Sequence, residues 1–169
     1  MYYETFKQMK KHLVQMGTWL EAAEAFAKEK AFDANTFLTL RLAPDQFAFA
    51  RQVQITCDTA KLAASRLTGK EAPKNDDSEK TLGELKDRVK ATIAYLDGFT
   101  ANDFAKAAEA VITQPRWEGK TMTGADYFME HALPNFFFHA THTYAILRHS
   151  GVNLGKRDFL GALTQKPAP

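Results

Sequence analysis

The chain has 169 residues, the size of one ordinary domain, and is long enough to bury a core without disulfides. Its 45% hydrophobic residues, 25% charged residues and net charge of +2 are typical of a globular protein and exclude a strongly basic nucleic-acid binder. Its one cysteine, Cys57, excludes an internal disulfide. The N-terminus lacks the apolar segment of a signal peptide, and no apolar run approaches the ~18 residues of a membrane span. We therefore expect a cytoplasmic protein with one domain over residues 1–169 and neither a nucleic-acid nor a membrane partner.

The first predicted helix runs from about Tyr3 to Lys30. Apolar residues recur at spacings of three and four and form one face, which is the pattern of an amphipathic helix. This face consists of Phe6, Met9, Leu13, Met16, Leu20, Ala23 and Ala27. His12 lies beside it but also next to Lys10 and Lys11, and we expect His12 at the surface.

The second predicted helix runs from about Asp45 to Leu67. Pro44 and Asp45 suit a helix start, since proline fits the first turn and aspartate the positive end of the helix dipole. Gly69 can end the helix in the left-handed conformation.

This helix is unusually apolar on most of its sides. From residue 46 to residue 57 its only charged side chain is Arg51, so we expect the helix at the centre of a bundle. Three polar residues, Gln52, Gln54 and Asp58, then need partners if they are buried.

A polar loop, KEAPKNDDSEK, precedes a third predicted helix from about Thr81 to Leu96, which Gly98 ends. Residues 101–110 can form a short helical turn. The segment VITQPRWEGKTMTG combines β-prone residues with proline and glycine, and it predicts a short hairpin or an irregular excursion.

The last predicted helix begins after Thr123, which with Asp126 forms a near capping box, and continues to about His149. Gly151 ends it. Four long helices without convincing sheet strands predict an all-α protein, and specifically an irregular four-helix bundle.

Polar residues form one narrow stripe on this last helix. At ~100° per residue, the stripe covers only ~80° and is flanked by apolar side chains, so it faces the bundle interior or its mouth. It contains His131, Asn135, His139, His142 and His149. Helical bundles build metal and cofactor sites in their interior, which makes the stripe a candidate site.

His139 and His142, three residues apart, can reach one point and are the candidate metal ligands of the stripe. His131 and His149 cannot both join them, because the eighteen residues between His131 and His149 span ~27 Å of helix, and at most two or three of these side chains make one site. A histidine on an apolar face is also commonly a core residue bonded to a partner. Both interpretations remain open from the sequence.

A zinc site needs three or four ligands, and the second predicted helix would have to supply the remainder. Asp58 and Cys57 are the candidates there, with Gln52 or Gln54 as weaker oxygen donors. Asp58 could instead hold a histidine ring in one tautomer without any metal.

Two stretches carry a family resemblance: APDQFAFARQVQITCDTAK, and TMTGADYFMEHALPNFFFHATHTYAILRHSGVNLGKRDFLG. They resemble an uncharacterised bacterial branch of the DinB/YfiT-like superfamily, and the resemblance covers nearly the whole chain. It implies an up-down-down-up four-helix bundle that is commonly a homodimer. Many members bind nickel or zinc through three histidines, one on the second helix and two in an HxxxH pair on the fourth. Some are thiol-dependent transferases or isomerases.

The resemblance places the second histidine of that pair on His139 and the first on Asn135, which is a poor ligand for zinc or nickel. The second helix has no histidine, and Gln52 or Gln54 stands in its place. His142 could substitute one turn along the helix. We therefore expect the metal site to be lost or remodelled.

Two functional hypotheses follow. In the first, a polar pocket between the second and fourth helices acts on a small molecule by transfer or isomerisation, with or without a divalent metal and a thiol. Its catalytic candidates are His139 and Asp58, and its lining candidates are Gln52, Gln54, Asn135 and His142. In the second, the protein is a non-catalytic binding or stress-associated module, and the same polar residues form an internal hydrogen-bond network that gives conformational specificity. A site requires His139 to be accessible from a cavity, whereas a structural network requires both ring nitrogens to be bonded.

Overall fold

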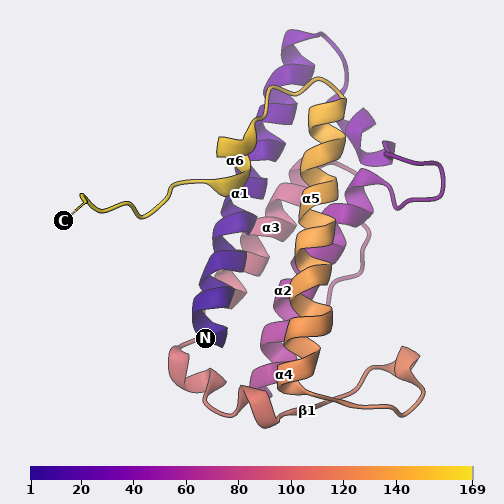
Figure 1. Cartoon of the computed structure of the whole chain (residues 1–169). Coiled ribbons are helices and arrows are strands. Elements are labelled where there is room, and N and C mark those ends of the chain that lie inside the picture. Colours follow the sequence, from indigo (N-terminus) through magenta and orange to yellow (C-terminus); the bar gives the residue numbers. More distant parts are fainter. Residues whose placement is uncertain (169) are drawn as a thin grey trace.

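The computed structural model describes residues 1–168, which form a bundle of long helices (Figure 1). The long helices are α1 (Tyr2–Glu29), α2 (Phe49–Thr68), α3 (Leu82–Asp97) and α5 (Leu133–His149). The four predicted helices are confirmed, and most of their ends lie within a few residues of the predicted ones. No helix within residues 1–168 has the length and hydropathy needed to cross a bilayer.

Contacts at opposite ends of the helices fix their directions. Lys10 near the start of α1 pairs with Asp97 at the end of α3, and Glu24 near the end of α1 pairs with Lys86 near the start of α3. The two helices are therefore antiparallel. α2 runs parallel to α3, and α5 runs parallel to α1, so the order is up-down-down-up as the resemblance implied (Figure 1).

The apolar faces of these helices meet in one core. The largest fully buried side chains are Trp19, Tyr127, Phe37, Phe49, Phe128 and Phe136. Burying such a side chain contributes roughly 1.5–3 kcal/mol relative to leaving it exposed, so these residues dominate the hydrophobic stabilisation of the bundle.

The predicted start of the second helix is wrong. α2 begins at Phe49, after a short 3-10 helix (η1, Ala34–Thr39). Pro44 and Asp45 instead occupy the middle of a turn that the Gln46 N–H closes on the Ala43 carbonyl at 3.1 Å. Proline followed by aspartate fits the central positions of a β-turn as well as a helix start, which is why the sequence misplaces the boundary.

The predicted surface position of His12 is also wrong. Its side chain is buried, its Nδ1–H donates to the Gln8 carbonyl at 3.0 Å, and the rings of Phe137 and Phe159 pack edge-on against it. Phe159 belongs to α6 (Lys156–Leu160), which folds back onto α1. The burial, which lowers the pKa of His12, comes from this distant segment and not from its lysine neighbours.

The chain between α3 and the last long helix is irregular, as predicted. It contains two 3-10 turns, η2 (Ala101–Phe104) and η3 (Ala107–Glu109), and a hairpin of β1 (Val111–Ile112) with antiparallel β2 (Met122–Thr123). A further 3-10 turn, η4 (Pro115–Trp117), lies in the hairpin loop. Gly124 then passes so close to the Ala107 carbonyl that any Cβ would clash with it at 1.8 Å.

The last helix is not a uniform α-helix. It starts as α4 (Gly124–Asp126), where Thr123 Oγ1 accepts from the Asp126 N–H as predicted, and continues through a π-helical turn, η5 (Tyr127–Ala132), into α5. A π-turn holds one more residue per turn than expected. A rotation of ~100° per residue therefore describes the stripe within α5, but it does not give the direction of His131, which lies within η5.

Candidate functional site

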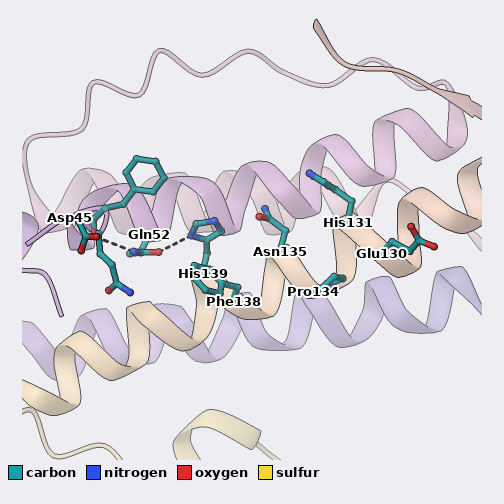
Figure 2. A pocket seen from close by; sticks show the side chains of 10 residues that line it. Asp45, Gln52, Glu130, His131, Pro134, Asn135, Phe138 and His139 are labelled. Atoms are coloured by element: carbon teal, nitrogen blue, oxygen red, sulfur yellow. Dashed lines mark hydrogen bonds between the residues drawn. The ribbon is translucent and has the colours of Figure 1, made fainter. Parts of the chain in front are cut away.

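His139 on α5 faces Gln52 on α2, and one hydrogen bond of 2.7 Å joins His139 Nδ1 to Gln52 Oε1 (Figure 2). The amide nitrogen of Gln52 donates to the Phe47 carbonyl at 3.0 Å. A backbone carbonyl can only accept, so this bond fixes the orientation of the amide and turns its oxygen toward the imidazole. Nδ1 of His139 must therefore carry the proton.

The other ring nitrogen of His139, Nε2, is consequently an unprotonated acceptor. It has no hydrogen-bond partner within residues 1–168, and it is not among the polar atoms sealed from solvent. Burial lowers the pKa of His139 to about 4, with smaller contributions from His142 and Arg51. The ring is thus neutral near pH 7 and offers one oriented lone pair.

A cavity of about 580 Å³ lies beside His139, between α2, α5 and the segment that precedes α2. Its lining consists of Asp45, Gln46, Phe47, Gln52, Glu130, His131, Pro134, Asn135, Phe138 and His139. Most of the wall is apolar, with a few polar groups, which is the usual character of a site for a small organic molecule.

Asn135 lies one turn before His139 and also lines this cavity. Its Nδ2 donates to Thr59 Oγ1 at 2.8 Å, and the Thr59 hydroxyl donates to the Ile55 carbonyl at 2.7 Å. This chain of hydrogen bonds orients the Asn135 amide and ties the middle of α5 to α2.

His142 lies beside the cavity and is not part of its lining. Its Nδ1–H donates to the Phe138 carbonyl at 2.7 Å, and its Nε2 accepts from the Gln46 amide at 3.2 Å. Because both ring nitrogens are engaged, His142 holds two residues of the cavity wall instead of offering a free ligand.

Gln54 and Asp58 lie on other faces of α2 than Gln52. Two and six residues along a helix correspond to ~200° and ~240°, so neither side chain can follow Gln52 toward His139. Gln54 donates to Glu79 at 2.8 Å, and Asp58 accepts from Arg88 at 2.8 Å. The interpretation that Asp58 orients a histidine is therefore wrong for the arrangement of residues 1–168.

Two further candidates also lie away from His139. Cys57 is buried, and its burial raises the pKa of the thiol to about 12, so it is not a ready metal ligand. His149 is exposed at the end of α5.

Four residues line the pocket that the sequence does not predict there: Phe47, Asp45, Glu130 and Phe138. Phe47 and Asp45 enter the wall because α2 starts late and the turn around Pro44 folds over α2. The Pro-Asp pair is the signal that could have indicated this turn.

A three-histidine metal site of the DinB kind does not fit these residues. The equivalent positions hold Gln52, Asn135 and His139, and the two amides are already hydrogen-bonded to protein groups. Within residues 1–168, no three His, Cys, Asp or Glu side chains lie close enough to share one metal ion. One imidazole nitrogen is too few for a stable divalent site.

Comparisons with known proteins agree with this architecture. Residues 1–160 match a domain family of unknown function, DUF1993. The crystal structure of a DinB family member protein from Shewanella denitrificans is similar over 99% of this chain and 96% of that chain, with 50% sequence identity and a TM-score of 0.95. No curated protein matches the chain. The DinB-like all-α fold implied by the sequence resemblance is thus confirmed, and the chain belongs to the DUF1993 family.

Proposed function

We propose that the cavity beside His139 binds a small, largely apolar molecule through a hydrogen-bond donor on that molecule. The supporting observation is that Gln52 holds Nδ1–H of His139 while Nε2 is left free next to the cavity. The apolar wall around Phe47 and Phe138 supplies the hydrophobic part of the binding energy.

The pKa of His139 favours recognition over proton transfer. An efficient general base has a pKa near the working pH, whereas burial lowers that of His139 to about 4. A neutral imidazole with this pKa is a weak base but a good acceptor. We therefore propose a binding role for His139, and a catalytic role only for a substrate that donates an acidic proton.

Phenol and toluene test the proposal, because both are benzene rings with one small substituent. Only phenol has a hydrogen-bond donor, its hydroxyl group. Protein with ¹⁵N-labelled histidine is titrated with each, and the Nε2 resonance of His139 is followed by NMR. Phenol is expected to bind more tightly than toluene and to shift this resonance. His149→Gln, at an exposed histidine, should leave the preference intact, whereas His139→Phe should remove it. Equal binding of both probes with no shift would reject the proposal.

The alternative function is a nickel- or zinc-dependent transferase or isomerase, with or without a thiol. Metal analysis of untagged protein, purified without chelators, separates the two functions. We expect no stoichiometric metal, because His142 and Gln52 are already engaged with other groups. Stoichiometric nickel or zinc that disappears in His139→Ala would overturn the binding proposal in favour of the metal-dependent enzyme.

We also propose that the chain forms a homodimer. The DinB-like fold supports this, as do three large apolar side chains near the cavity that are more than half exposed: Phe47 (56%), Met129 (54%) and Phe138 (53%). Light scattering of the purified protein should give twice the chain mass of 19.0 kDa. A mass equal to that of one chain would reject the dimer.

A further inference from the structure

A second pocket, of about 330 Å³, adjoins the His139 cavity. It lies between α2, the loop of the β1–β2 hairpin and the π-helical turn η5, and it shares His131 and Asn135 with the first cavity. Its wall differs in character, because it includes three arginines: Arg51, Arg66 and Arg116.

Two of these arginines have no carboxylate partner within residues 1–168. Arg51 pairs with Asp77, but Arg66 donates to the Tyr127 hydroxyl at 2.9 Å, and Arg116 donates to His131 Nε2 at 2.5 Å. Both of these acceptors are neutral groups, so the charges of Arg66 and Arg116 are not compensated.

The carboxylate in the wall, Asp58, does not neutralise them either. It forms ion pairs with Lys61 at 2.9 Å and with Arg88 at 2.8 Å, and these two side chains are 4% and 3% exposed. Asp58 is therefore committed to two buried cations, and the pocket keeps a net positive character.

Gln114, in the wall of this pocket, has a buried donor without a partner in the described part of the chain. Gln114 is only 8% exposed, yet its Nε2 has no hydrogen-bond partner within residues 1–168. An unpaired buried N–H costs about 1–3 kcal/mol, so such a group is normally satisfied by an acceptor. Because this nitrogen is sealed from solvent, a molecule in the pocket does not reach it, and Gln114 lines the pocket without offering a donor.

His131 adds no positive charge to the pocket. Because its Nε2 accepts from Arg116, its Nδ1 carries the proton, and this second N–H is also buried without a partner. Burial and the charges of Arg116 and Arg66 lower the pKa of His131. The ring is thus neutral, and the positive charge of the pocket resides on the arginines.

We propose that this pocket binds an oxyanion, the carboxylate or phosphate group of a small molecule, between Arg66 and Arg116. Guanidinium groups match the planar, multidentate geometry of both oxyanions, and their hydrogen bonds to anions are about twice as strong as neutral ones. The site does not depend on the function proposed for the His139 cavity.

The test is a titration of the full chain with inorganic phosphate and with benzoate in a low-salt buffer, followed by NMR of the arginine Nε–H groups and of the His131 ring. At least one anion should shift the signals of Arg66, Arg116 and His131. A preference for phosphate assigns a phosphorylated ligand, and a preference for benzoate assigns a carboxylic acid. If neither anion shifts these signals, the proposal is overturned.

Variants show whether the binding is specific. Arg116→Gln, at an exposed arginine, and Arg66→Gln should each weaken binding about tenfold, the loss expected for a hydrogen bond to a charged group. Arg148→Gln, at an exposed arginine on α5, is the matched control and should bind like wild type. Equal losses in Arg116→Gln and Arg148→Gln would show non-specific attraction and overturn the site. Circular dichroism shows whether each variant is folded. If Arg66→Gln does not fold, Arg116→Gln alone decides the result.

Discussion

At His139, one hydrogen bond determines which ring nitrogen is available to a ligand. The resemblance places a metal-binding histidine at Gln52 or Gln54, and the amide of Gln52 is bonded at both ends, to His139 and to the Phe47 carbonyl. A neutral histidine in place of Gln52 would have only one lone pair, so it could either accept from Nδ1–H of His139 or bind a metal ion, but not both. The substitution thus converts a metal-ligand position into an orienting group for His139.

The low pKa of His139 predicts a loss of stability in acid. The unfolded histidine titrates near 6.5 and the folded one near 4, so between these values the unfolded state binds more protons. Stability is then full above about pH 6.5 and decreases as the pH falls toward 4, by on the order of 3 kcal/mol from this group.

Urea unfolding at about pH 7 and about pH 4.5 measures this effect. His12 and His131 contribute in the same direction, because their pKa values are also lowered. His139→Asn removes only the contribution of His139. The free energy of unfolding of this variant should therefore decrease less between the two pH values than that of wild type. An equal loss in both proteins would contradict the burial of a neutral His139.

Gln52→Glu should raise the pKa of His139. The change places a carboxylate at the position that is 2.7 Å from Nδ1, and an adjacent negative charge stabilises the imidazolium. NMR titration of the ring is the measurement. Gln8→Glu is the matched control, because Gln8 Nε2 lies 3.3 Å from Nδ1 of His12 instead. If Gln52→Glu leaves the His139 titration unchanged, the hydrogen bond between the two side chains is not formed.

Residue patterns identified the centre of the site but not its surroundings. The sequence predicts a pocket lined by Gln52, Gln54, Asn135, His139 and His142, and three of these, Gln52, Asn135 and His139, line the cavity. Asn135 and His139 share one side of α5 because the stripe within this helix obeys the helical period. Asp58 was placed with them only because it lies on the same helix, and the helical period turns it toward Arg88. The wall formed by Phe47 depends on a turn in the preceding segment, which periodicity does not describe.

At the level of elements, the sequence predicts helix ends correctly where the local residue pattern is compatible with only one structure. The near capping box at Thr123 marks a true helix start, and Gly69 ends α2 in the left-handed conformation, as predicted. The Pro44–Asp45 pair has two meanings, a helix start and a β-turn, and the turn is the one that forms. The π-helical turn η5 leaves no signal in the apolar pattern, so the orientation of His131 could not be derived from the spacing of residues.

The capping box at the start of α3 should contribute measurable stability. Thr81 Oγ1 accepts from the Glu84 N–H at 3.1 Å, and the Glu84 carboxylate accepts from the Thr81 N–H at 2.9 Å. Thr81→Ala removes the first of these bonds and should cost about 1 kcal/mol. Thermal or urea unfolding measures the loss. Thr141→Ala, at an exposed threonine on α5, should change stability by much less, and equal effects would show that the cap contributes nothing.

For the whole molecule, the parallel arrangement of α2 and α3 imposes a long connection along the bundle. Residues 69–81 make this connection without regular structure (Figure 1). Three of its acidic or amide side chains bond to residues of α2 and α3. Asn75 donates to Asp58, Asp77 pairs with Arg88 at 2.7 Å, and Glu79 pairs with Arg88 at 2.8 Å. The four helices could be predicted from periodicity, but the polar string KEAPKNDDSEK gives no indication that its carboxylates meet one buried arginine.

The pKa values of this cluster show that the carboxylates are charged in the folded state. Burial pushes the pKa of Asp77 and of Glu79 upward, but the nearby arginines outweigh it and hold both below their ordinary values. Burial likewise opposes the charge of Arg88, and the carboxylates of Glu79, Asp58 and Asp77 keep its pKa above the ordinary value. The cluster therefore stabilises the protein above the pKa of unfolded carboxyl groups, about 4, and this stabilisation is lost as the pH falls below it.

Arg88→Met tests whether this arginine holds the connection in place. Methionine fills much of the same volume but leaves the carboxylates of Asp77 and Glu79 without their buried cation, which should cost about 3–5 kcal/mol at neutral pH. The cost should shrink at about pH 3, where the carboxylates become neutral in the variant. Urea unfolding at the two pH values measures both effects, with Lys90→Met, at an exposed lysine on α3, as the control. A small, pH-independent cost equal to that of Lys90→Met would mean that the connection follows its path along the bundle without help from Arg88.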